Sequence, residues 1–170
     1  MPVLFCHGLE SSPQGRKVQA LRAAGLEVIA PDFQGQNLAA RVATLLPVLR
    51  AHPDALVIGS SYGGITALCA AILHSEAGGS VRGLLLCAPA LGRYESPADA
   101  LRLYPPAPTV ILHGRRDSVV PVQVSEDFAA AHPEVRLELV DDDHRLNASL
   151  ERMLALTHEL LAATTPQPAA

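Results

Sequence analysis

The sequence has little that would suit it to a nucleic acid or a membrane. It contains no tryptophan and few other aromatic residues, and its acidic and basic residues are interspersed with a net charge of −4. No basic stripe is present, so we expect no nucleic-acid partner. No run of about 18 apolar residues is present that would span a membrane. The N-terminus lacks the cationic start and the apolar run of about 7–15 residues that a signal peptide needs, so we expect a globular, cytoplasmic protein.

Cysteine is also scarce, and its pattern argues against a disulfide framework. Cys6, Cys69 and Cys87 each lie in an apolar segment, their number is odd, and no C-x-x-C spacing occurs. We expect three buried, free thiols. Cys87, near a strand end, is the one alternative candidate for a cysteine nucleophile. Histidines and aspartates do not fall at zinc-ligand spacing, so no metal or other cofactor is expected.

Short apolar runs alternate with helical patterns along the chain. We expect strands over Val3–Cys6, Glu27–Ala30, Ala55–Ile58, Gly83–Cys87, Thr109–His113 and Val135–Val140. We expect helices over Pro13–Ala24, Leu38–Arg50, Ile65–Glu76, Val122–Ala131 and Arg145–Ala162. Pro47 is expected to kink the second helix or to end it early. This alternation predicts a parallel sheet of about six strands with helices on both faces. We expect one α/β domain over residues 1–163 and a flexible tail over 164–170.

One short motif nominates a nucleophile. Gly59-Ser60-Ser61-Tyr62-Gly63 follows an apolar strand and precedes a helix, which is the G-x-S-x-G pattern in its strand–turn–helix context. A turn this tight strains the serine backbone, and its neighbours two residues away must nearly lack side chains. The alternative is that Ser61 only caps the helix. The two flanking glycines favour a nucleophile, whereas Ser60 is expected to be structural.

A serine hydroxyl needs a base within hydrogen-bond reach and an acid that orients the base. Ligands bind beyond the carboxyl ends of parallel strands, and His144 and Asp117 follow the last two predicted strands. The order Ser61, Asp117, His144 is that of the α/β-hydrolase triad. The alternatives for the acid are Asp141, Asp142 and Asp143, but three consecutive acids are more often a solvated turn.

With these motifs the chain resembles an α/β-hydrolase that lacks the family's first two strands. His7-Gly8-Leu9-Glu10-Ser11-Ser12-Pro13 and Gly59-Ser60-Ser61-Tyr62-Gly63-Gly64 are most similar to the small YqiA-type esterases. The resemblance implies an oxyanion hole built from two backbone amides, those of Tyr62 and, after the His-Gly strand, Leu9. It also implies that His7, His113 and Asp32 order loops.

About twenty residues separate Cys87 from Thr109, which leaves no room for a cap domain. We expect an open site with Leu91, Tyr94 and Tyr104 in its wall, and the sequence leaves open whether Ala98–Leu103 forms a partial lid. Arg115 and Arg116 are expected to be surface charges or to contact an anionic leaving group. The leading hypothesis is a serine hydrolase acting on small to medium acyl esters. Thioesters or amides are alternative substrates, and a catalytically weak binding or regulatory module is the alternative function.

Overall fold

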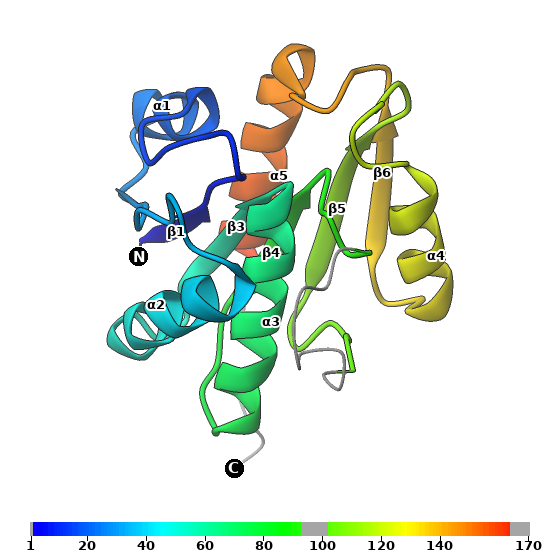
Figure 1. Cartoon of the computed structure of the whole chain (residues 1–170). Coiled ribbons are helices and arrows are strands. Elements are labelled where there is room, and N and C mark those ends of the chain that lie inside the picture. The colour runs from blue at the N-terminus through cyan, green and yellow to red at the C-terminus, as the bar shows by residue number, and fades with distance from the viewer. Residues whose placement is uncertain (1, 93–101, 164–170) are drawn as a thin grey trace.

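Within residues 2–92 and 102–163, which the computed structural model describes, six parallel strands form one sheet in the order β2-β1-β3-β4-β5-β6 (Figure 1). The strands are β1 (Val3–Cys6), β2 (Val28–Ile29), β3 (Leu56–Ser60), β4 (Gly83–Cys87), β5 (Thr109–Gly114) and β6 (Arg136–Val140). Each expected strand is present. The predicted minimal α/β-hydrolase fold, a parallel sheet of about six strands, is confirmed.

Helices cover both faces of the sheet, as predicted. They are α1 (Arg16–Ala23), α2 (Leu38–Ala51), α3 (Tyr62–Glu76), α4 (Gln123–Ala131) and α5 (Leu150–Ala162). Alternate strand residues point to opposite faces, so Leu4 packs with α2 and α3, whereas Val3 and Phe5 pack with α1 and α5. Helix α4 packs on the first of these faces. The strands are therefore buried on both sides, which explains their continuous apolar sequence.

The chain builds the sheet outward in opposite directions from β1 and from β3, which are neighbours at its centre. After β1 the chain crosses to β2 on one side, and after β3 it crosses to β4 on the other. The loops that follow β1 and β3 therefore diverge and leave a crevice at the carboxyl edge of the sheet. Both of the sequence motifs singled out above, His7-Gly8 and Gly59–Gly63, lie at this edge.

Several helix boundaries differ from the expected ones. Helix α1 begins at Arg16 rather than at Pro13, and α3 begins at Tyr62 rather than at Ile65. Helix α2 does not end at Pro47 but continues to Ala51, because Leu45 and Leu49 of its inner face are fully buried and hold the last turn in place. Helix α5 begins at Leu150 rather than at Arg145. Leu146 has a φ of 55°, in the left-handed region, and a 3₁₀ turn over Asn147–Ser149 precedes the helix. Such a φ is incompatible with a continuous α-helix from residue 145.

The segment between β4 and β5 packs differently from the expectation. Leu91 is buried in the core, and Tyr104 packs against the same core cluster, so neither lines the cleft described below. Residues 102–105 are not helical. Tyr94, residues 98–101 and the predicted tail 164–170 lie outside the described residues. In the part of the chain that is described, no helix combines the length and the apolar character needed to cross a membrane.

Candidate active site

Ser61 lies at the sharp turn between β3 and α3, with φ of 57° and ψ of −120°. The predicted strained backbone is thus confirmed, since a positive φ is rare outside glycine. The turn is held by backbone hydrogen bonds. The Ser61 N–H donates to the carbonyl of Cys87 at the end of β4 (2.9 Å), and the Ser61 carbonyl accepts from Gly64 (2.9 Å) and Ala90 (3.0 Å). These bonds fix the backbone that carries the hydroxyl.

The flanking glycines are sterically required. A Cβ atom on Gly63 would overlap the carbonyl of Cys6 and lie 2.8 Å from that of His7, and one on Gly59 would lie 2.7 Å from the Cα of Gly64. In each case the obstacle is backbone, which cannot move aside as a flexible side chain does. Helix α3 therefore packs against the ends of β1 and β3 at backbone contact distance, which places Ser61 beside the loop after β1.

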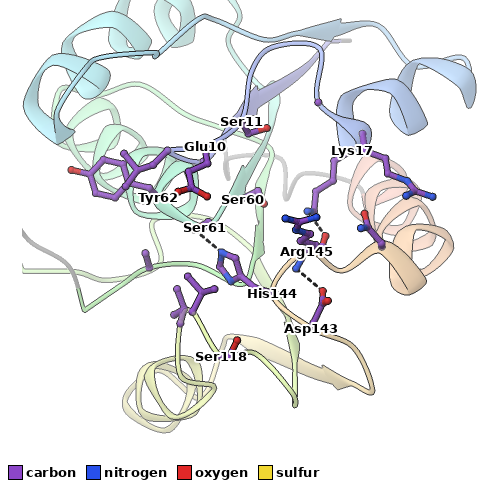
Figure 2. Close-up of a pocket in the computed structure, with 18 of the residues that line it drawn as sticks. Glu10, Ser11, Lys17, Ser60, Ser61, Tyr62, Ser118, Asp143, His144 and Arg145 are labelled. Atoms are coloured by element: carbon purple, nitrogen blue, oxygen red, sulfur yellow. Dashed lines mark hydrogen bonds between the residues drawn. The ribbon is translucent and has the colours of Figure 1, made fainter.

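His144 bridges Ser61 and Asp117 (Figure 2 shows the bond to Ser61). Its Nε2 lies 2.9 Å from Ser61 Oγ, and its Nδ1 lies 2.7 Å from Asp117 Oδ2. An ionised carboxylate only accepts hydrogen bonds, so Nδ1 carries the proton and Nε2 is left to accept from the serine hydroxyl. The structure thus brings together the three side chains that the sequence analysis singled out, with the imidazole hydrogen-bonded to both the hydroxyl and the carboxylate.

Asp142 holds the loop that carries His144. The expectation of a solvated turn fails for this residue, although its neighbours Asp141 and Asp143 are exposed. The Asp142 side chain is buried and accepts hydrogen bonds from the Ser149 hydroxyl (2.9 Å), the Ala148 amide (2.9 Å) and the Asp143 amide (2.7 Å). Burial opposes its ionisation, but these bonds outweigh burial and lower its pKa. Asp142 is therefore not a rival to Asp117, because its carboxylate is bound to Ala148 and Ser149 in the turn before α5.

The Asp117 carboxylate accepts hydrogen bonds on both oxygens. Oδ1 accepts from the backbone amides of Val119 and Val120, each at 2.8 Å, and Oδ2 accepts from His144. The side chain is fully buried. Burial opposes ionisation, yet the bonds from His144, Val120 and Val119 outweigh it, so the pKa of Asp117 lies below its ordinary value. The Asp117 carboxyl group is therefore ionised near neutral pH.

A second histidine shares this carboxylate, which the sequence analysis did not foresee. His113 Nε2 lies 3.0 Å from Asp117 Oδ2 and 3.0 Å from the Val120 carbonyl, and Nδ1 lies 2.7 Å from Ser125 Oγ. Both neighbours of Nε2 are acceptors, so Nε2 carries the proton and Nδ1 accepts from the Ser125 hydroxyl. His113 precedes Asp117 by four residues at the end of β5, and this spacing in His113-Gly114-x-x-Asp117 was the one available signal.

His7 orders the loop after β1, as the resemblance implied. Its Nε2 accepts from the Phe33 amide (2.9 Å), and its Nδ1 donates to the Gly8 carbonyl (2.8 Å). Asp32, in the loop after β2, lies beside this imidazole, with its Oδ1 3.5 Å from His7 Nε2. The imidazole thus connects the loops that follow β1 and β2, and it is fully buried, away from the cleft.

A cleft with a volume of about 890 Å³ opens over Ser61 and His144. It is lined by the loops after β1, β3, β5 and β6 and by the start of α1 (Figure 2). Leu9 and Tyr62, the residues predicted to supply the oxyanion amides, both line it, and a Cβ on Gly8 would lie 3.4 Å from Ser61 Cβ. Arg115 and Arg116 do not line it, and Arg116 pairs instead with Asp141 (2.6 Å).

The cysteines contribute no competing nucleophile. All three are free and buried, as predicted. Burial raises the pKa of Cys6 to about 12 and those of Cys69 and Cys87 to about 11. Each thiol is therefore protonated near neutral pH, and the thiolate is the nucleophilic form.

Comparison with known proteins agrees with this architecture. The model of the alpha/beta hydrolase family matches residues 3–169, and the chain belongs to that family. No relative among the curated proteins matches. A solved structure assigned to the hydrolases of the alpha/beta superfamily, from Xanthomonas campestris, is 28% identical with a TM-score of 0.78; the alignment covers 96% of this chain and 100% of that one.

Two more distant structures share the fold. Est1E from Butyrivibrio proteoclasticus is 19% identical with a TM-score of 0.73, over 95% of this chain and 89% of its own. Alpha/beta hydrolase domain-containing protein 10 from mouse is 21% identical with a TM-score of 0.75, over 94% and 89%. Family and neighbours together support a hydrolase.

Proposed function

We propose that the protein is a serine hydrolase that cleaves small to medium carboxylic esters or thioesters through an acyl-enzyme. The observation that carries this proposal is the pair of hydrogen bonds that His144 makes, 2.9 Å to Ser61 Oγ and 2.7 Å to Asp117 Oδ2. Ser61, Asp117 and His144 lie at the carboxyl edge of the sheet in the chain order that the sequence analysis predicted. The environment of each side chain supports a separate role in the reaction.

Ser61 is the nucleophile in this proposal. Its Oγ attacks the acyl carbonyl while His144 Nε2 takes the hydroxyl proton. His144 then gives that proton to the departing alkoxide or thiolate, which leaves an ester of the Ser61 oxygen. A water molecule, deprotonated by His144, attacks this ester. His144 then returns the proton to the departing Ser61 Oγ, and the carboxylic acid is released. Asp117 holds the His144 tautomer and stabilises the imidazolium that forms in both steps.

The oxyanion of each tetrahedral intermediate needs hydrogen-bond donors that are already in place. We assign the backbone amides of Tyr62, at the start of α3, and Leu9, in the loop after β1. Both residues line the cleft beside Ser61. The loss of one such donor costs about 10²–10³ in rate. Arg41 supports this arrangement, because it donates to the His7 carbonyl (2.8 Å) and lies over the Tyr62 ring.

Labelling with a fluorophosphonate probe tests the nucleophile. We expect wild-type protein to react at Ser61, and the Ser61→Ala variant to fold and remain unlabelled. Ser60→Ala is the matched control, since Ser60 is the adjacent hydroxyl at the end of β3 and lines the same cleft. A folded wild-type protein that resists the probe would favour a binding or regulatory module, and labelling that survives Ser61→Ala would disprove the assignment.

The substrate class requires a separate measurement. Acetyl to octanoyl esters, the corresponding thioesters and the anilides should be compared by kcat/KM under the same conditions. We expect esters and thioesters to exceed anilides, because an amine is the poorest leaving group of the three. Faster cleavage of anilides would make the protein an amidase.

A further inference from the structure

The cleft carries a set of basic side chains that the proposed chemistry does not use. Arg16 and Lys17, at the start of α1, and Arg145, which follows His144, line it together. Lys17 is the single lysine of the whole sequence. Arginines supply the other twelve cationic side chains, so the one lysine side chain of the sequence lies in the cleft of the candidate nucleophile.

These three cations have no acidic partner within the described part of the chain. No ion pair involves Arg16, Lys17 or Arg145 there, and the Lys17 ammonium contacts a backbone carbonyl instead. Three arginines outside the cleft do have acidic partners. Arg116 contacts Asp141, and Arg136 and Arg152 share Glu138 and Glu159. The cations of the cleft therefore lack the direct ion pairs that these three arginines have.

Lys17 is held in place although it is not neutralised. Its Nζ donates to the Arg145 carbonyl at 2.7 Å, a bond that joins α1 to the loop carrying His144. This uses one of the three N–H donors of the ammonium. Burial lowers the pKa of Lys17, and the nearby Cys87, Asp142 and Asp143 oppose that shift. An anion that docks beside Nζ would replace the lost solvation of the ammonium.

Two acidic residues, Glu10 and Asp143, also line the cleft, and they do not cancel the charge of its three cations. Glu10 lies on the other side of Ser61, near Tyr62, whereas Lys17 and Arg145 lie together beyond His144 (Figure 2). Asp143 is on the cationic side, but its Oδ1 accepts from the Arg145 backbone amide at 2.8 Å. Three cations and the one carboxylate of Asp143 leave a net positive charge on this side of the nucleophile, and Glu10 is the carboxylate on the other side.

From this arrangement we propose that the substrate is an ester or thioester that carries a carboxylate or phosphate, bound by Lys17 and Arg145 while its acyl carbonyl lies at Ser61. The inference rests on the proposed function and narrows its substrate class. Lys17 contacts the carbonyl of the residue after His144 and lines the same cleft as Ser61, so one substrate could place its anion there and its acyl carbonyl at Ser61.

Two matched substrate pairs test the proposal and distinguish which part of the substrate carries the anion. Monomethyl glutarate and methyl pentanoate differ only by a terminal carboxylate on the acyl part. The 4-acetoxybutyrate anion and butyl acetate differ in the same way on the alcohol part. Hydrolysis is followed by pH-stat titration. We expect the wild type to prefer the anionic member of at least one pair, and the preference to fall as salt screens the charges.

The variants assign that preference to the two side chains. Lys17→Met and Arg145→Gln should each lower the ratio of kcat/KM, anionic over neutral ester, by about tenfold, the loss of one charged hydrogen bond. Lys17→Arg should restore most of the ratio, which separates charge from the structural bond to the loop. Arg50→Gln, an exposed arginine at the end of α2 outside the cleft, is the control with the same charge change and should leave the ratio unaltered.

Failure of this inference and failure of the proposed function give different results. Equal loss on both members of a pair, or no preference in the wild type, would overturn the anion site while hydrolysis dependent on Ser61 stands. If the wild type cleaves no ester, binding of monomethyl glutarate and methyl pentanoate to Ser61→Ala is compared by saturation-transfer NMR. If Ser61→Ala binds monomethyl glutarate more tightly than methyl pentanoate, and a further Lys17→Met substitution abolishes that difference, the anion site is supported without the hydrolase. Equal binding of the two esters would overturn the anion site.

Discussion

Replacement of Ser61 by glycine should give a more stable protein than replacement by alanine. Both variants remove the hydroxyl and its bond to His144, so the comparison isolates the backbone. Ser61 has φ of 57° and ψ of −120°, a conformation that glycine adopts without a steric penalty. Elsewhere in a chain the order is reversed, because glycine loses more conformational freedom on folding than alanine.

The magnitude follows from two opposing terms. A non-glycine residue in such a sparsely populated region costs about 1–3 kcal/mol, which Ser61→Gly relieves and Ser61→Ala does not. The additional entropy of glycine in the unfolded chain costs about 0.4–1 kcal/mol. The difference favours glycine by about 1–2 kcal/mol. For a domain of this size, each kcal/mol corresponds to about 2–4 °C in Tm.

Urea unfolding of the two variants, followed by circular dichroism, measures this difference directly. Ser75, in the last turn of α3, provides the control pair, and there Ser75→Gly should be less stable than Ser75→Ala by up to about 1 kcal/mol. An order at residue 61 that matches the order at residue 75 would refute the reasoning, since it would mean that the turn stores no strain that alanine retains.

Three further predictions concern the carboxylate beside the imidazole. Asp117→Asn should lower kcat by about 10⁴ with the fold intact, because the amide favours the wrong tautomer of His144; a loss below tenfold in steady-state assays would contradict this. His113→Leu should lower kcat about tenfold by removing one charged hydrogen bond, and His113→Gln, which retains a donor, should recover part of it; equal losses would assign His113 a packing role only. The lowered pKa values of Asp117, Glu138 and Asp142 predict a free energy of unfolding that is constant above about pH 5 and falls below about pH 4; urea midpoints that do not change between pH 6 and pH 3 would contradict it.

The sign of the pH prediction follows from the direction of the shifts. A carboxyl group whose folded pKa lies below its unfolded value stabilises the protein above the unfolded pKa. That contribution is lost as the pH falls through the folded value. Asp142→Asn provides a check on the source of the effect, because it removes one titrating group. The variant should be less stable at pH 7 and should lose less on acidification than the wild type.

The arrangement of the sheet and the positions of Ser61, Asp117 and His144 could be predicted because the relevant information is local. A strand buried on both faces must be a continuous apolar run, and a parallel strand must be followed by a crossover. Polar residues directly after such runs therefore share one edge of the sheet. The glycines at 59 and 63 report a close approach of backbones that any side chain would block. These inferences need no knowledge of which distant segments touch.

The supporting contacts could not be predicted because they join residues far apart or depend on the exact path of a loop. Asp142 reads as one of three consecutive surface acids, and only the turn at Leu146 brings the amide of Ala148 back to its carboxylate. The sequence predicts that Leu91 lines an open site, but the chain after β4 turns so that this side chain packs in the core. In both cases the sequence indicates whether the side chain is acidic or apolar, but not the direction in which the folded chain points it.

Arg41 shows the same limit at the point where it matters most for catalysis. In the sequence it is one basic residue in a helix, where an exposed position would be the ordinary expectation. In the fold its guanidinium is buried, donates to the carbonyl of His7 thirty-four positions away and lies over the ring of Tyr62. It thus connects the two loops whose amides we propose to bind the oxyanion, so their separation depends on a cation that no motif identifies. A nucleophile is set by its immediate neighbours in the chain, but the spacing of the groups that would stabilise its transition state is set by side chains elsewhere.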